Sequence, residues 1–238
     1  SKIHKANFPR TNAFKAPFPG HSTSLDWAGP FRVRSPFGHR YFALFVDVNT
    51  RKKTIRLSKR KDELEEFVLD YVAMIERQLQ PNKVVCLVSD GAVNIGTLRA
   101  RLRTMGITVL VIAPNSARLN LVERGNRTVA EGARSMMATA GLPPTFFLLA
   151  CKAAVDADNR VFKQTEVCAA DGRPLSPLEL FDGRARESVK ALMQGLRVFG
   201  SGGWALQYTN KQVTKSERVL ILGCFADDNP KAYFLMSL

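Results

Sequence analysis

The stretch YFALFV at residues 41–46 decides the expected fold. Six consecutive apolar residues, three of them aromatic, predict a strand that is buried on both faces. A turn at residues 49–51 separates it from residues 53–57 (KTIRL), where polar and apolar side chains alternate as in a strand that returns beside the first. Residues 25–30 (LDWAGP) come before this pair, and we expect them to contribute a third antiparallel strand.

Beyond residue 57 the pattern alternates between helix and strand. We expect helices at 62–80, 97–105, 117–140 and 145–160, and strands at 84–88 and 108–112. Strands that alternate with helices pair in parallel. Three antiparallel strands followed by such alternation is the layout of the ribonuclease-H-like fold, so we predict the α/β class, with a mixed sheet flanked by helices.

The same pattern suggests four segments. Residues 1–24 lack acidic residues and mix cations with Phe-Pro pairs, which predicts a basic extended arm. Residues 25–165 form the ribonuclease-H-like core, and residues 166–195 are polar and read as a linker. Residues 196–238 carry short apolar runs separated by turn residues, which favours a small C-terminal β-barrel.

The composition indicates which kind of partner the protein binds. The 238 residues include 35 Lys and Arg against 21 Asp and Glu, a formal net charge of +14. Binding to a polyanion such as nucleic acid explains this excess better than a role in solubility alone. No apolar run approaches the ~18 residues of a membrane span, so we expect no membrane partner. The four cysteines are far apart and only three histidines are present, which argues against zinc. Cys86 and Cys151 lie in apolar runs typical of reduced, buried thiols in an intracellular protein.

Three acidic residues stand in settings suited to catalysis. Asp26 lies on the first strand, Asp90 directly follows the strand at 84–88 and Ser89, and Glu123 lies in the first turns of the long helix. Ligands of open α/β sheets gather beyond such strand ends. Two carboxylates 4 Å apart repel by ~4 kcal/mol at an effective dielectric constant of 20, so their cluster calls for divalent cations. Two Mg²⁺ ions would suit an in-line displacement at phosphorus.

Each acid also has a plain structural interpretation. Asp26 and Asp90 both precede turn residues, and Glu123 is placed to pair with Arg127 four residues later. Asp47, near the end of the second strand, looks similar but fits the site less well.

Several cations are expected to bind nucleic-acid phosphates without reading sequence. Arg127 and Arg134 share a helix face with Glu123 and would extend a cationic track away from the metal site. The triplets at 51–53 and 59–61 are expected to mark exposed turns. The full expected set is Lys59, Arg60, Arg99, Arg103, Arg118, Arg124, Arg127 and Arg134.

An ordered series of motifs carries a resemblance over nearly the whole chain. The motifs are D-x-x-G-P at 26–30, YFALFVD at 41–47, SD at 89–90, E-R-x-N-R-T at 123–128, ARSM at 133–136, AGLP at 140–143, P-x-E-L-F at 177–181 and LRVFG at 196–200. Together they resemble the integrases of copia-type retrotransposons. The resemblance implies that Asp26, Asp90 and Glu123 hold two Mg²⁺ ions for 3′-end processing and strand transfer of DNA.

The residues around two of these acids depart from the family. Asp90 is followed by Gly-Ala-Val where the family has Asn-Gly, and Arg118-Leu-Asn-Leu replaces a Gln-Asn-Gly segment before Glu123. The alternative is therefore a domesticated, catalytically retired domain that is a structural or RNA-binding part of a larger, organellar assembly. We expect a nuclear integrase that works as an oligomer or in a larger complex, or a mitochondrial protein under the alternative.

Overall fold

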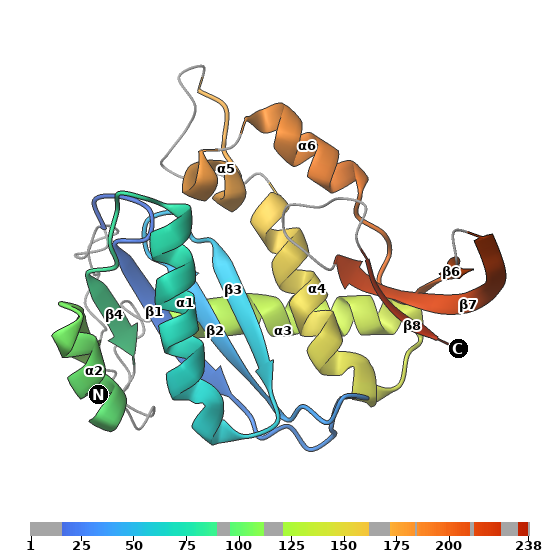
Figure 1. Ribbon diagram of the computed structural model, residues 1–238, viewed down its shortest axis with the longest axis horizontal. Coiled ribbons are helices and arrows are strands. Elements are labelled where there is room, and N and C mark those ends of the chain that lie inside the picture. The colour runs from blue at the N-terminus through green and yellow to red at the C-terminus, as the bar shows by residue number, and fades with distance from the viewer. Residues whose placement is uncertain are drawn as a thin grey trace, which may run out of the picture.

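The computed structural model describes residues 16–89, 96–111, 121–161, 172–183, 185–209, 212–224 and 233–237. Its main sheet contains β1 (Ser22–Ala28), β2 (Tyr41–Asp47), β3 (Lys53–Ser58), β4 (Cys86–Ser89) and β5 (Thr108–Val111) in the order β3-β2-β1-β4-β5. β2 is antiparallel to both β1 and β3, whereas β1, β4 and β5 are parallel. The predicted mixed α/β sheet is confirmed (Figure 1).

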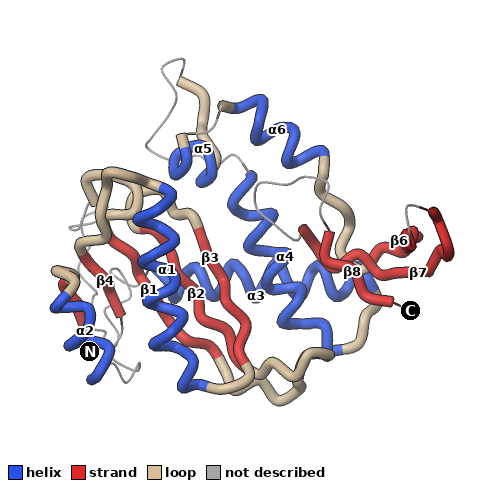
Figure 2. Tube along the Cα trace, in the orientation of Figure 1, coloured by secondary structure: helices blue, strands red, loops and turns tan. Residues whose placement is uncertain are grey.

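Helices cover both faces of this sheet. α1 (Leu64–Gln78), preceded by the 3₁₀ turn η1 (Lys61–Glu63), crosses the front face, and α3 (Leu121–Ala140) lies behind it (Figures 1 and 2). α2 (Gly96–Thr104) lies beside β4, and α4 (Phe147–Arg160), after the turn η2 (Pro144–Phe146), packs along α3. None of the described helices is long and apolar enough to cross a membrane.

β2 divides the core between the two faces, as its apolar sequence predicts. Ala43 and Phe45 join the α1 cluster, and the Phe45 and Tyr71 rings stack with centroids 4.4 Å apart. Phe42, Leu44 and Val46 join the cluster formed with α3 and α4. Successive strand residues point to opposite faces, so a strand between two helical layers must be apolar throughout.

The structure has helices or strands in two segments where the sequence suggests none. β1 begins at Ser22, inside the expected arm, and its first three residues are fully buried although all are hydroxyl-bearing. α5 (Pro177–Asp182) and α6 (Arg186–Gln194) lie in the expected linker. Ser176 and Glu179 form a capping box that starts α5, and Phe181 reaches the α1 cluster.

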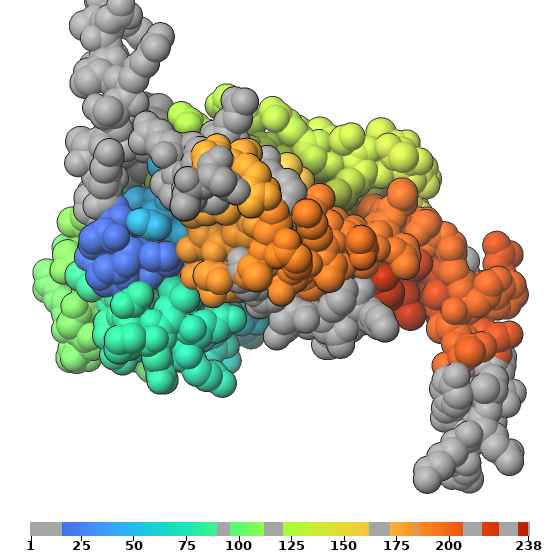
Figure 3. Space-filling model, turned by 90° about the horizontal axis from the view of Figure 1, so that it is seen from above, coloured from blue at the N-terminus to red at the C-terminus, as the bar shows by residue number. Residues whose placement is uncertain are grey.

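The C-terminal segment forms a three-stranded antiparallel sheet in its described part, and the expected barrel is not confirmed. β6 (Ser201–Thr209), β7 (Gln212–Cys224) and β8 (Tyr233–Ser237) pair in chain order. Phe199 and Leu222 are buried in the same cluster as α3 and α4. This sheet lies at the end of the molecule remote from α1 and α2 (Figures 1 and 3). Through Leu222 it shares an apolar cluster with the main body.

The lysines of the 51–53 triplet are buried, which corrects the expectation of an exposed basic turn. Lys53 forms an ion pair with Asp158, and its backbone N–H donates to Asn159 Oδ1 at 2.8 Å. The Lys52 ammonium lies 4.4 Å from the centre of the Phe181 ring. A carboxylate and an aromatic face compensate these charges inside the protein, so the two lysines are not available for nucleic acid.

Candidate active site

Asp26 is held in place by two hydrogen bonds. It pairs across the sheet with Leu44, which packs toward α3, so the Asp26 side chain lies on the α3 face. Its Oδ1 accepts the Trp27 backbone N–H at 2.7 Å, and its Oδ2 accepts Asn126 Nδ2 at 2.6 Å. A half-buried carboxylate on β1 is thus joined to α3 across 100 positions of sequence.

Gly125 explains how α3 comes close enough for this bond. A Cβ atom placed at Gly125 would lie 3.1 Å from Val46 Cγ2 and 3.2 Å from Leu44 Cδ2. Because glycine lacks that atom, the helix backbone can approach the sheet directly over β2. Asn126 then reaches β1 from the next position along the helix.

Glu123 lies one turn before Asn126 on α3. Residues three apart on a helix are surface neighbours, so the Glu123 carboxylate and the Asn126 amide occupy one side of the first turns. Glu123 is exposed, whereas Asn126 is half-buried. The bond from Asn126 to Asp26 therefore places the turn of α3 that carries Glu123 at the same corner of the sheet as Asp26. Sequence reasoning did not select Asn126, although its position in the E-R-x-N motif was the available signal.

Asp90 lies outside the described residues. β4 ends at Ser89, the residue before it, and runs parallel to β1 with Val88 beside Ser24. The carboxyl end of β4 therefore lies at the same edge of the sheet as the end of β1 that carries Asp26. Within the described ranges, no group of three His, Cys, Asp or Glu side chains is arranged to hold a metal ion.

Asp47 has a structural role. It is fully buried and accepts hydrogen bonds from Gly20 N at 2.9 Å, Thr50 N at 2.7 Å and Thr50 Oγ1 at 2.8 Å. Burial raises its pKa, and the hydrogen bonds from Thr50 and Gly20 oppose that rise. Asp47 lies at the opposite end of β2 from the Asp26 edge and fixes the β2–β3 turn.

The expected phosphate-binding cations are exposed wherever the structure describes them. Arg124, Arg127 and Arg134 lie along α3, and Arg99 and Arg103 lie on α2. Lys59 and Arg60 are exposed at the end of β3, where Arg60 pairs with Asp62 at 2.5 Å. Arg118 lies outside the described residues. The α3 arginines begin beside Glu123 and continue along the helix.

The chain is similar in sequence to Pol polyproteins of plant transposons. No family model matches the chain. It is 31% identical over 138 residues, 57% of its length, to the retrovirus-related Pol polyprotein from transposon TNT 1-94 of Nicotiana tabacum. It is 26% identical over 162 residues, 68% of its length, to the retrovirus-related Pol polyprotein from transposon RE2 of Arabidopsis thaliana. The chain spans only 10% and 11% of these two relatives.

One solved structure shares the fold of this chain, and a second aligns with a lower score. A chain of the simian T-cell lymphotropic virus intasome in complex with PP2A regulatory subunit B56 gamma aligns with a TM-score of 0.54 and 14% identity, covering 98% of this chain and 82% of that one. The HTLV-2 integrase catalytic core domain in complex with magnesium aligns with a TM-score of 0.48 and 13% identity, over 69% of this chain and 97% of that one.

Proposed function

We propose that this chain, which is related to plant retrotransposon Pol polyproteins and folds like a retroviral integrase core, is a metal-dependent polynucleotidyl transferase acting on DNA ends. The observation that carries the proposal is the hydrogen bond from Asn126 Nδ2 to Asp26 Oδ2. It joins a strand carboxylate to the helical turn that bears Glu123, at the sheet edge where β4 ends.

The donors at this corner fit a hard divalent cation. Asp26 and Glu123 supply carboxylate oxygens, and Asp90 is proposed as the third ligand. Asn126 Oδ1 is buried and, among the described residues, accepts no hydrogen bond, so an unsatisfied oxygen lies beside Asp26. When bound, Mg²⁺ neutralises the carboxylates and lowers the pKa of an attacking hydroxyl, and two such ions are proposed.

The residues of the chain supply orientation and charge. Asn126 and the Trp27 N–H hold the Asp26 carboxylate in one rotamer, so a metal ligand is set before substrate arrives. Arg124, Arg127 and Arg134 are proposed to bind backbone phosphates leading away from Glu123.

The proposed reaction is strand transfer after 3′-end processing. The oxygen of a DNA 3′-hydroxyl attacks a phosphorus atom of a second DNA and forms a new P–O bond. The opposite P–O bond breaks, the attacking hydroxyl loses its proton to solvent, and the departing 3′ oxygen gains one. Arginines beside the acids would hold both strands in line for this displacement.

Strand transfer of a labelled oligonucleotide into a plasmid tests the proposal. With Mg²⁺, the wild type and the control Asp62→Asn, a change at an exposed acid paired with Arg60, should both give product. Asp26→Asn, Asp90→Asn and Glu123→Gln should each lower the yield at least about a hundredfold. Equal product from all five proteins would overturn the metal-site assignment.

The second candidate function is a non-catalytic nucleic-acid-binding module, favoured by the replaced residues after Asp90 and before Glu123. It predicts no product from wild type at any Mg²⁺ concentration, with retained binding to structured RNA. The integrase proposal implies a nuclear location, and the module implies a mitochondrial one.

A further inference from the structure

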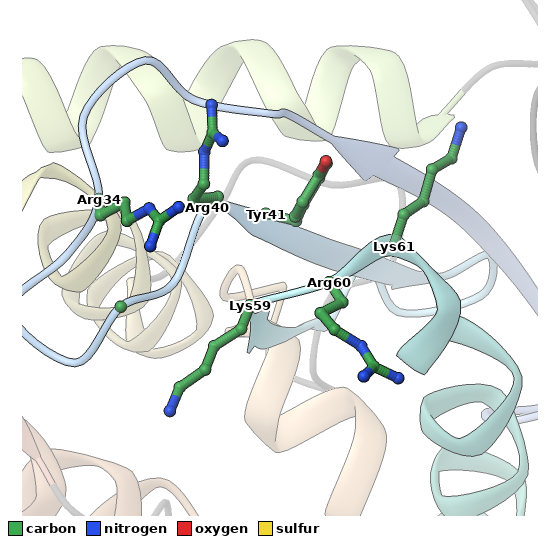
Figure 4. A pocket seen from close by; sticks show the side chains of 7 residues that line it. Arg34, Arg40, Tyr41, Lys59, Arg60 and Lys61 are labelled. Atoms are coloured by element: carbon green, nitrogen blue, oxygen red, sulfur yellow. The ribbon is translucent and has the colours of Figure 1, made fainter.

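A second group of cations comes from elements other than α3. Arg34, Gly38, Arg40, Tyr41, Lys59, Arg60 and Lys61 line a hollow of about 560 Å³. We call it the loop hollow, because its residues come from the β1–β2 loop and from the corner between β3 and η1. Figure 4 shows Arg40, Tyr41 and Lys61 extending on one side of the strand end and Lys59 and Arg60 on the other.

The loop hollow lies at the same end of the sheet as the proposed metal site. β1 runs toward it, since Ala28 pairs with Phe42, next to Tyr41, whereas Asp26 pairs with Leu44. The carboxyl end of β4 lies at this edge as well, because β4 is parallel to β1. A polymer held by the proposed metal site could therefore continue past the end of β1 into the hollow.

Backbone contacts fix the β1–β2 side of the hollow. Ser35 N donates to His39 O at 2.9 Å and Gly38 N donates to Ser35 O at 2.8 Å, which closes a tight turn. Phe31 N donates to Arg40 O at 2.8 Å, and a Cβ at Gly29 would lie only 2.6 Å from that same oxygen. The loop is thus folded back on Arg40 in an arrangement that needs glycine at position 29.

The β3–η1 side is fixed by Ser58. Its Oγ donates to Glu63 Oε2 at 2.8 Å and accepts the Arg60 N–H at 3.0 Å, while its carbonyl accepts the Arg40 N–H at 2.9 Å. The two walls are therefore tied to each other, so little ordering of the backbone would be needed on binding.

The charge of the hollow is largely uncompensated. Arg60 pairs with Asp62, but Arg34, Arg40, Lys59 and Lys61 form no ion pair with any carboxylate in the described part of the chain. Nearby, the pKa of His39 is lowered first by burial and then by the Lys59 charge, while Glu63 opposes the shift. Four unpaired cations around one concavity attract a polyanion.

We propose that the loop hollow binds a backbone phosphodiester of the nucleic acid, as a contact separate from the arginines of α3. This inference rests on the proposed function and extends it, by giving the substrate a second anchor beyond the end of β1. Arg34 and Arg40 offer planar guanidinium groups for paired hydrogen bonds to phosphate oxygens. Lys59 and Lys61 add charge without reading the bases.

The test is binding of a labelled oligonucleotide in EDTA, followed by fluorescence anisotropy over a range of salt concentrations. The hollow variant is Arg34→Gln/Lys61→Gln. The control, Arg77→Gln/Lys83→Gln, removes the same charge from exposed Arg77 in the last turn of α1 and from exposed Lys83, which follows α1 and pairs with Glu76. The hollow variant should bind about tenfold more weakly than wild type, and its slope of log K against log salt should fall by about 1. The control should stay within about twofold of wild type.

Two results would overturn the inference. One is equal affinity and equal salt slope for the hollow and control variants. The other is an unchanged oligonucleotide affinity with loss of binding to inorganic pyrophosphate, which would make the hollow a site for small phosphates. The binding assay is done in EDTA and needs no catalysis. A protein that fails in the strand-transfer assay would therefore count against the proposed function and would not change the interpretation of the binding result.

Discussion

At the scale of single residues, Asn126 decides where the Asp26 carboxylate points. A hydrogen bond to a charged acceptor contributes about 1.5–3 kcal/mol, enough to favour one carboxylate orientation strongly. Asp47 shows the contrast, because two of its three hydrogen bonds come from Thr50 in its own turn and the third comes from Gly20, just before β1, at the opposite end of the sheet from the Asp26 edge. The two aspartates look alike in sequence and differ in which elements contact them.

Asn126→Ala should lower the apparent affinity for Mg²⁺ more than it lowers the stability of the fold. Without the amide, Asp26 Oδ2 loses its partner and the carboxylate can rotate, so the Mg²⁺ concentration for half-maximal strand transfer should rise about tenfold or more. The matched control is Thr128→Ala, at an exposed α3 position two residues later. Thr128→Ala should leave the Mg²⁺ titration unchanged. The same Mg²⁺ dependence of strand transfer for Asn126→Ala and wild type would contradict the positioning role.

Asp47→Asn should change how stability depends on pH. Burial raises the folded pKa of Asp47 above its unfolded value near 3.9, so the folded state holds the proton more tightly. Ionised Asp47 therefore costs stability above its folded pKa, and that cost disappears as pH falls through the folded pKa toward about 4. The free energy of unfolding of wild type relative to Asp47→Asn should rise over this fall in pH. A difference that is constant with pH would refute the assignment.

Local sequence context places Asp26 on a strand and Glu123 on a helix, and the structure has β1 and α3 in contact, whereas the catalytic role of these acids stays a prediction. Partners that come from distant parts of the chain leave no such local signal. Lys52 and Lys53 were expected to be exposed, because nothing local signals Phe181 or Asp158, which lie more than 100 positions away. Asn126 was missed for the same reason, since its partner is on another element.

At the scale of elements, the contact of α3 with the sheet sets the site. Gly125 faces Val46 and Leu44, both in the core, and this close approach brings Asn126 to β1. The helix was predictable from its 3.6-residue period, and the strands were predictable from short apolar runs and from the alternation at residues 53–57. The start of β1 was not, because Ser22, Thr23 and Ser24 are polar residues buried by their neighbours and carry no apolar signal.

Gly125→Ala should destabilise the protein despite the better helix propensity of alanine. The propensity gain of about 1 kcal/mol is outweighed by overpacking of about 1–3 kcal/mol, because Val46 and Leu44 have little room to move. Strand-transfer activity should also fall, by more than the loss of folded protein explains, because α3 must shift away from Asp26. Chemical denaturation measures the first effect, with Thr128→Ala as the control. A more stable Gly125→Ala protein with full activity would show that α3 does not need this close approach.

At the scale of the whole molecule, the C-terminal sheet and the main body share one core. Leu222 on β7 and Phe199 are buried with residues of α3 and α4. The sequence predicted strands here, and strands are present. The sequence does not show whether these strands close into a barrel or which element they pack against. Short apolar runs are equally compatible with a separate barrel and with a sheet that packs on a neighbouring helix.

Leu222→Ala should therefore lower the stability of the whole protein. Truncating a buried leucine costs about 2–5 kcal/mol, and we expect a single unfolding transition at a lower temperature. Leu206→Ala, at a position on β6 that is 53% exposed, should change the melting temperature little. Calorimetry showing two transitions, with only one of them moved by Leu222→Ala, would mean that the C-terminal sheet folds independently.

If Asp26 and Glu123 hold a common divalent cation, as proposed, both must contribute to Mn²⁺ affinity, which electron paramagnetic resonance measures without any substrate. Wild type and Asp62→Asn should bind Mn²⁺ alike, whereas Asp26→Asn and Glu123→Gln should each bind it at least about tenfold more weakly. The same Mn²⁺ affinity for all four proteins would contradict the shared site.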